Sequence, residues 1–205
     1  MKNKDLRKVA KVILIVGVIL CGIAQILPWG RLELEIFPKE IQENSPFDLS
    51  NIAININYFH WGGMQISPKI SGVPEWFLTP TNFSGLSASP EIYGFAFGTL
   101  FLYFIIPLAI FSFITGLVAY RKVERKPSKN SLHAAISSIM AIIFFIIFIQ
   151  LTLANNLSNI EESAGFSANY HWSLGFYLMI CSSVLFFVAY AIIRRIYRRD
   201  ASTKE

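Results

Sequence analysis

The feature that most limits what this chain can fold into is a set of four long apolar stretches, separated by charged or polar segments. They cover about residues 9–28, 92–120, 132–153 and 172–193. A bilayer core about 30 Å thick is crossed by roughly 20 apolar helical residues. Each stretch meets or nearly meets this length, and only Lys11 lies at the entrance of one. The sequence therefore predicts an integral membrane protein, mainly α, built on a bundle of four transmembrane helices.

Charge is distributed unevenly along the chain and predicts which way the helices face. All but three of the 18 Lys and Arg residues lie before or at the entrance of the first stretch, between the second and third, or after the fourth. Short cytoplasmic loops retain Lys and Arg. We therefore expect a multi-pass protein of the cell or plasma membrane with cytoplasmic N- and C-termini and outer loops at about 30–91 and 154–171. Basic residues at helix ends suit anionic headgroups and do not indicate a nucleic acid as partner. The expected partners are the lipid bilayer and other membrane proteins or a second copy of this chain.

The first outer loop is too long to be a simple connector and carries strand patterns. Residues 31–36 alternate polar and apolar side chains, and Ile52, Ile54, Ile56 and Tyr58 alternate with more polar neighbours. Such alternation is typical of a half-buried strand. The loop therefore predicts a small extracellular antiparallel β-sheet standing on the outer ends of the helices.

A Gly-Gly pair between two strand patterns indicates a tight hairpin. Gly62 and Gly63 precede a short strand pattern at residues 64–67, so we expect the hairpin there. The rest of the loop, rich in proline, is expected to be irregular. The second outer loop could add one strand or extend a helix.

The chain is expected to form one tetraspan domain over residues 1–205. Its basic start and first apolar run resemble a signal peptide, but the run continues to Leu27, which favours a retained helix. Small residues spaced by four, Gly94 with Gly98, Ser112 with Gly116 and Ala134 with Ser138, allow close approach of helices.

Two cysteines and two glycosylation patterns leave alternatives open. Cys21 and Cys181 lie inside the first and fourth stretches, where they either pack as small apolar residues or meet in a bridge. Asn82 and Asn156 each begin an Asn-x-Ser pattern in an outer loop. Occupancy of these patterns depends on the organism.

No group of residues predicts catalysis, and we expect neither an enzyme nor a bound cofactor. The spans carry no ionisable residue that would mark an ion or proton path. His60 and His171 both lie in outer loops, in the similar strings NYFHW and NYHW. A metal site needs three or four ligands, so these two histidines are weak candidates, and an interfacial aromatic belt is the alternative.

The layout resembles the superfamily of claudins, peripheral myelin protein and epithelial membrane proteins. The resemblance is carried by Leu27-Pro28-Trp29 at the end of the first helix, by Trp61-Gly62-Gly63-Met64 in the first outer loop, and by the string from Tyr170 to Phe176, followed later by Arg194-Arg195. It implies four helices, cytoplasmic termini and a sheet in the first outer loop. Claudins place a cysteine pair after the tryptophan cluster; this loop has none, so junction formation is not implied.

The expected function is non-enzymatic: a claudin-like membrane protein that mediates protein–protein contacts in or between membranes. The alternative is an accessory structural subunit of a larger membrane enzyme or transporter. A small lipid-modifying enzyme is a third possibility, but no cluster of Asp, His or Ser supports it. Candidate motif and contact residues are Trp29, Trp61, Gly62, Gly63, Trp76 and Trp172.

Overall fold

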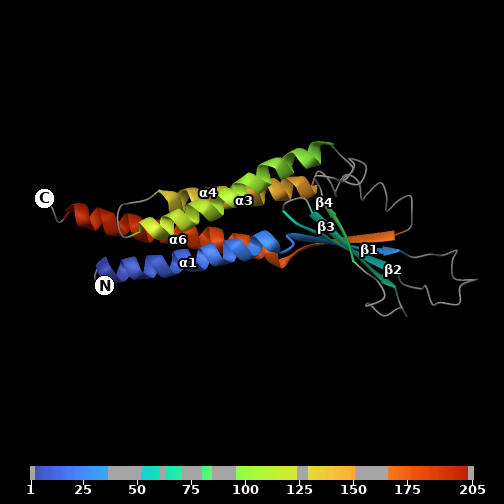
Figure 1. Ribbon diagram of the computed structural model, residues 1–205, viewed down its shortest axis with the longest axis horizontal. Coiled ribbons are helices and arrows are strands. Elements are labelled where there is room, and N and C mark those ends of the chain that lie inside the picture. Colours follow the sequence, from blue (N-terminus) through green and yellow to red (C-terminus); the bar gives the residue numbers. More distant parts are fainter. Residues whose placement is uncertain are drawn as a thin grey trace, which may run out of the picture. The chain divides into compact units, whose positions relative to one another are not determined.

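The computed structural model of the chain describes residues 3–36, 52–60, 63–70, 80–84, 96–123, 129–150 and 166–202. The elements in chain order are α1 (Asn3–Ile26), β1 (Gly30–Ile36), β2 (Ile52–Tyr58), β3 (Gly63–Ile70), β4 (Thr81–Ser84), α3 (Ala96–Lys122), α4 (Asn130–Ile149), β5 (Phe166–Trp172) and α6 (Leu174–Ser202) (Figure 1). They form two compact units. The helical unit contains Met1–Ile26, Phe104–Phe144 and Gly175–Glu205, and the sheet unit contains Leu27–Tyr103 and Phe145–Leu174.

Four helices are long and apolar enough to span a membrane, as the sequence predicts. Several helix ends differ from the ends of the apolar stretches; α1, for example, begins at Asn3 and not at residue 9. The fourth helix begins at Leu174 and not at residue 172, because Trp172 still pairs with Gly30 in the sheet. It also continues to Ser202, well past residue 193, because arginine is a good helix former and extends the helix beyond the apolar stretch.

The helices of the helical unit expose large apolar side chains, and their buried positions combine small or weakly polar residues with larger ones such as Leu14 and Phe186. On α1, large apolar side chains such as Val12 and Ile19 are exposed, whereas Ala10, Gly17 and Cys21 are buried. Lipid is as apolar as leucine, so helices in a membrane gain from close packing of small residues and hydrogen bonds between helices. The apolar outer surface supports a membrane environment for the four helices.

The small residues singled out in the sequence make the helix contacts. Ser112 on α3 donates a hydrogen bond to the carbonyl oxygen of Ala134 on α4 at 2.9 Å, and its hydroxyl also contacts that of Ser138. Gly116 leaves room for Phe186 of α6, whose ring would lie 2.7 Å from a Cβ at this position. The predicted close approach at Ser112, Gly116, Ala134 and Ser138 is therefore confirmed.

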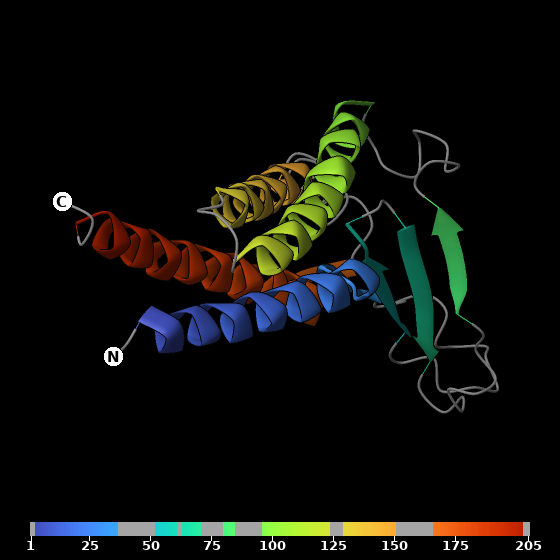
Figure 2. The same cartoon turned by 60° about the vertical axis from the view of Figure 1, so that its left-hand side comes forward.

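The helical unit also brings α1 and α6 side by side (Figure 2). Gly17 of α1 lies against the ring of Phe186, and Cys21 contacts Met179 of α6. Both cysteines are free: Cys21 is buried, and Cys181 is exposed on α6. The packing alternative therefore holds for Cys21, and the two cysteines form no bridge.

The sheet unit contains one five-stranded antiparallel sheet with strand order β4-β3-β2-β1-β5. The predicted hairpin is confirmed by β2 and β3, in which Tyr58 pairs with Met64 and Ile56 with Ile66. The last strand, β5, comes from the segment between α4 and α6. The second outer loop therefore adds a strand, which is one of the two possibilities that the sequence left open.

The expectation of irregular structure after residue 67 is wrong in two places. Strand β3 continues through Pro68 to Ile70, and Thr81–Ser84 form β4. Proline is tolerated on a strand where one side lacks a ladder partner. β4 pairs only with Gly63–Ile66, so Pro68 lies where β3 has β2 alone as its described neighbour.

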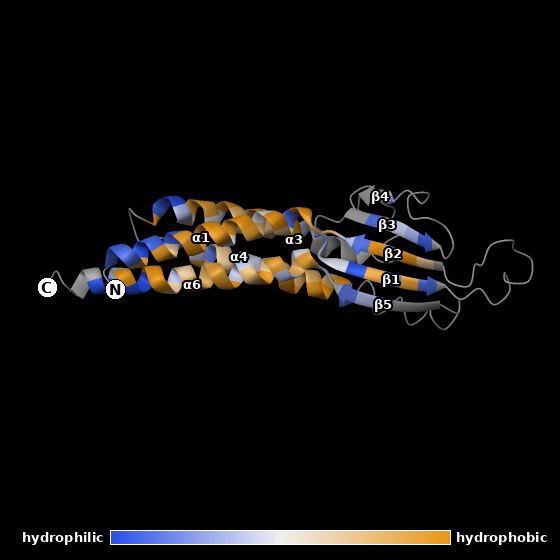
Figure 3. Ribbon diagram, turned by 90° about the horizontal axis from the view of Figure 1, so that it is seen from below, coloured by the Kyte–Doolittle hydropathy of each residue, from blue (hydrophilic) through white to orange (hydrophobic). Residues whose placement is uncertain are grey.

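The sheet has one apolar and one polar face, which follows from the register. Leu32 pairs with Ile56 and Tyr170, and Leu34 pairs with Ile54. On the other face Arg31 pairs with Asn57 and His171, and Glu33 pairs with Asn55 and Asn169. Figure 3 shows the strands side by side, with apolar and hydrophilic residues interleaved along them. Leu32 and Tyr58 are buried, whereas Leu34, Ile54, Ile56, Ile66 and Pro68 are only half-buried.

Candidate functional site

Trp29 anchors one end of the sheet unit through its backbone. Its N–H donates to the carbonyl oxygen of Tyr58 at 2.8 Å, and its own carbonyl oxygen accepts from the N–H of Ser173 at 3.0 Å. The next residue, Gly30, pairs with both Tyr58 and Trp172. The two bonds of Trp29 therefore extend the pairing of β1 with β2 and its pairing with β5 by one residue each. Trp29 is thereby tied to β2 and to the residue that follows β5.

The side chain of Trp29 is the centre of an aromatic cluster formed by Trp29, His60, Phe145 and Trp172. The indole is fully buried and stacks on the His60 ring at a centroid distance of 5.0 Å. Phe145 meets it edge-on at 5.2 Å and lies 6.4 Å from Trp172. Aromatic pairs in such geometries contribute about 0.5–1.5 kcal/mol beyond the area they bury. The cluster therefore joins β1, the end of β2, α4 and β5.

His60 is held in this cluster as a neutral ring. It is 3% exposed, and its Nδ1 has no hydrogen-bond partner among the described residues. Burial lowers the pKa of His60 to about 4, from an ordinary value near 6.5. A neutral imidazole stacked on indole serves packing and has no described partner that would make it a general base.

Gly30 provides the space for Tyr170. A Cβ at Gly30 would lie 2.0 Å from the Tyr170 hydroxyl oxygen, so only glycine fits beneath this ring. The hydroxyl is buried without a hydrogen-bond partner among the described residues. Burial, with a smaller contribution from Tyr58, raises the pKa of Tyr170. The phenol is therefore a packed ring with an unsatisfied oxygen.

We expect Gly30→Ala to lower the free energy of unfolding by about 1–3 kcal/mol, because the new methyl group overpacks against Tyr170. Tyr170→Phe alone should be neutral or stabilising by about 1 kcal/mol, since it removes an unsatisfied buried hydroxyl. The double variant should recover part of the loss. Unfolding in mixed micelles with increasing SDS measures all three, and strictly additive effects would argue that the two residues do not meet.

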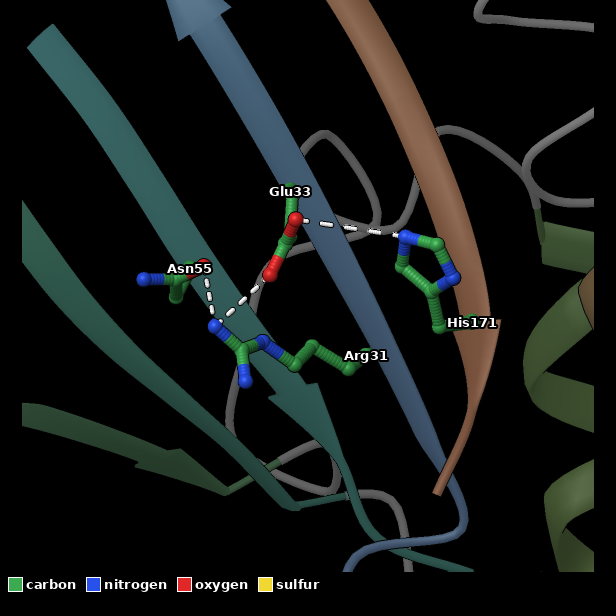
Figure 4. A network of polar contacts seen from close by, with 4 residues as sticks. All are labelled: Arg31, Glu33, Asn55 and His171. Carbon is green, nitrogen blue, oxygen red and sulfur yellow. Dashed lines mark hydrogen bonds and ion pairs between the residues drawn. The ribbon is translucent and has the colours of Figure 1, made fainter.

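The polar face of the sheet carries a network formed by Arg31, Glu33, Asn55 and His171 (Figure 4). The Arg31 guanidinium donates to Asn55 Oδ1 at 2.9 Å and lies 2.7 Å from Glu33 Oε1. His171 Nε2 lies 3.9 Å from the other Glu33 oxygen. Exposed pairs of this kind contribute only about 0–1 kcal/mol each. The network therefore adds little to the stability of the sheet, and its main effect is to place charged and polar groups at fixed positions on the sheet surface.

The structure places the two candidate histidines in different surroundings. His60 is buried against Trp29, whereas the His171 side chain is 60% exposed beside Glu33. No group of three or more His, Cys, Asp or Glu residues that could hold a metal occurs in the described part of the chain.

The structure describes some of the other candidate residues and leaves others outside its described ranges. Trp29 and Trp172 belong to the aromatic cluster, and Gly63 opens β3. Trp61, Gly62, Trp76 and Asn156 lie outside the described residues, and Asn82 lies in β4.

Sequence reasoning missed Gly30, Phe145 and the packing role of Tyr170. Phe145 gives no signal because it belongs to a uniformly apolar stretch. No family model matches this chain, and no curated protein matches it.

Proposed function

We propose that this chain is a non-enzymatic multi-pass membrane protein that binds other membrane proteins or a second copy of itself through its sheet. The observation that carries the proposal is the two-faced sheet. Leu34, Ile54, Ile56 and Ile66 lie on its apolar face and are only half-buried. Apolar area that a protein leaves accessible in one patch often marks an interaction site.

The polar face supports the same proposal from the opposite side of the sheet. Arg31 and Glu33 present both signs of charge within one network that also includes His171. Charge patterns of this kind contribute to the selection of partners and to register more than to affinity. In this proposal, the apolar face supplies the affinity for a partner protein, and the charged groups of the polar face select which partner binds.

A claudin-like role in contacts in or between membranes is the form of this function that we favour. It is supported by four strands from the segment between α1 and α3 and one from the segment between α4 and α6, beside four apolar helices. The missing cysteine pair separates this chain from junction-forming claudins. We place both termini in the cytoplasm and the sheet outside, because the basic residues cluster at the other ends of the helices.

The orientation has a direct test. Single cysteines introduced at Asn44 and Lys129, in a background without Cys21 and Cys181, should differ in intact cells. We expect the Asn44 site to react with an impermeant thiol reagent and the Lys129 site to react only after permeabilisation. The opposite result would invert the assignment.

Self-association should respond differently to two neighbouring substitutions. Ile54→Asp places a carboxylate on the apolar face, where burying it in a contact is costly. Asn55→Asp adds the same charge on the polar face. We expect Ile54→Asp to weaken association in nanodiscs at least about tenfold and Asn55→Asp about twofold or less. Cross-linking and mass photometry measure this, and equal effects would contradict a role for the apolar face.

The alternative role, an accessory subunit of a larger complex, is favoured by exposed aromatic residues on one helix. Tyr103, Phe104 and Phe111 of α3 are each at least half exposed. Aromatic side chains are favoured anchors in interfaces. Gentle extraction followed by mass spectrometry separates the roles: fixed, stoichiometric partners support the subunit, and copies of this chain alone support self-association.

A further inference from the structure

The C-terminal part of α6 presents arginines and apolar side chains on one stripe. A pocket of about 460 Å³ is lined by Phe187, Tyr190, Ala191, Arg194, Arg195, Arg198 and Arg199. Positions three and four apart share one face of a helix, so these residues form a continuous strip from an apolar to a basic end. We call it the α6 strip.

The strip lies at the depth where a lipid headgroup would be found. Residues 174–193 of α6 contain no charged residue, and at 1.5 Å per residue they are about 30 Å long, the thickness of a bilayer core. The first arginine follows immediately. Phe187, which is 55% exposed, lies about two turns back toward the apolar side.

Arg194, Arg195 and Arg198 of the strip have no described counter-charge. No Asp or Glu occurs on α6 before Asp200. Among the described residues, no ion pair involves Arg194, Arg195 or Arg198, all of which are exposed. Arg194 and Arg198 are four residues apart, and like charges at this spacing repel one another.

The neighbouring helix α1 adds basic residues to this end of the helical unit and carries one acidic residue, Asp5, in its first turn. Arg7 of α1 lies 5.8 Å from the ring of Tyr197, and Lys11 lies 5.5 Å from the ring of Tyr120. The hydrophilic ends of the helices gather together (Figure 3). A bound anion would relieve this repulsion.

The geometry points to a binding site for an anionic phospholipid on the α6 strip, with its phosphate held by Arg194, Arg195 and Arg198 and its acyl chain lying along Phe187 and Ala191. Guanidinium groups bind phosphate oxygens through two parallel hydrogen bonds. The apolar half of the strip distinguishes a lipid from a free anion, since a free anion has no use for Phe187. This inference rests on the proposed membrane location and is independent of the contacts made by the sheet.

The test is native mass spectrometry of the full chain in detergent, titrated with phosphatidylglycerol or with phosphatidylcholine of the same acyl chains. We expect clear preference for phosphatidylglycerol. The triple variant Arg194→Gln/Arg195→Gln/Arg198→Gln should bind it at least about tenfold more weakly, since each basic residue near an anionic lipid surface contributes about fivefold. A matched control, Arg121→Gln/Lys122→Gln/Lys129→Gln, removes the same charge from other exposed positions and should retain most of the binding.

A second pair of variants tests the same site without changing the arginines, so the proposal can still be tested if the triple variant misfolds. Phe187→Gln should weaken phosphatidylglycerol binding severalfold, whereas Phe111→Gln, at a similarly exposed phenylalanine of α3, should not. Equal losses in the α6 and control triples, or equal affinity for the two lipids, would overturn the site. Displacement of lipid by inorganic phosphate at constant ionic strength would overturn the lipid assignment. Ile54→Asp should leave lipid binding unchanged, so failure of the contact proposal and failure of this site are distinguishable.

Discussion

Replacing Trp29 with alanine should destabilise the sheet unit more than any other single change proposed for this chain. The indole is fully buried, stacks on His60 and meets Phe145 edge-on. Truncating a buried aromatic ring typically costs about 3–5 kcal/mol, because transfer free energy is lost and a cavity remains. We expect a loss of this size in the SDS unfolding of the purified chain in mixed micelles.

Trp172 is the matched control for Trp29. It belongs to the same aromatic cluster but is only half-buried, so Trp172→Ala should cost clearly less. Trp29→Phe should recover part of the loss, since a smaller ring still fills the space between His60 and Phe145. A Trp29→Ala variant as stable as the parent would mean that the indole is an interfacial anchor and no part of the core.

Mild acid should destabilise the chain through His60. The folded-state pKa is depressed to about 4, so the unfolded chain binds the proton more tightly between about pH 6.5 and pH 4. The contribution of neutral His60 to the free energy of unfolding is therefore fully present above pH 6.5. It is lost as the pH drops from 6.5 towards 4. Between pH 7.5 and pH 5 the loss should be about 2 kcal/mol, at 1.36 kcal/mol for each pH unit below 6.5.

Variants separate this loss from other titrations. His60→Phe keeps a ring against Trp29 but cannot take up a proton, so its unfolding should depend less on pH by the same amount. His171→Gln changes an exposed histidine and should keep the full acid sensitivity. An unchanged pH dependence in His60→Phe would mean that His60 does not remain neutral on folding.

The helices and the central hairpin could be predicted because their patterns are long and local. Four apolar stretches fix the helices by length alone, and the alternation around Ile54 and Leu34 fixes strand faces. Two of the small-residue pairs also predicted helix contacts, since Ser112 and Gly116 lie against other helices; Gly94 lies outside the described residues.

The remaining strands and the aromatic cluster could not be predicted, because their determinants are distant in the chain. β4 is four residues long and carries too few residues to show a period. Pro68 argues against a strand unless one knows that β4 begins at Thr81 opposite Ile66 and leaves the following part of β3 with β2 as its one described neighbour. Phe145 joins Trp29 only through tertiary packing.

The pairing of β1 also sets an order for biosynthesis. β1 lies between β2, which follows it closely in the chain, and β5, which immediately precedes the last helix. On a ribosome β2, the first partner of β1, emerges early, whereas β5 emerges only after α4. Until then one edge of β1 is an unpaired ladder of the kind that recruits other strands. A nascent or truncated chain lacking residues after 165 would therefore expose an aggregation-prone edge, and release from quality control is expected to wait for the fifth strand.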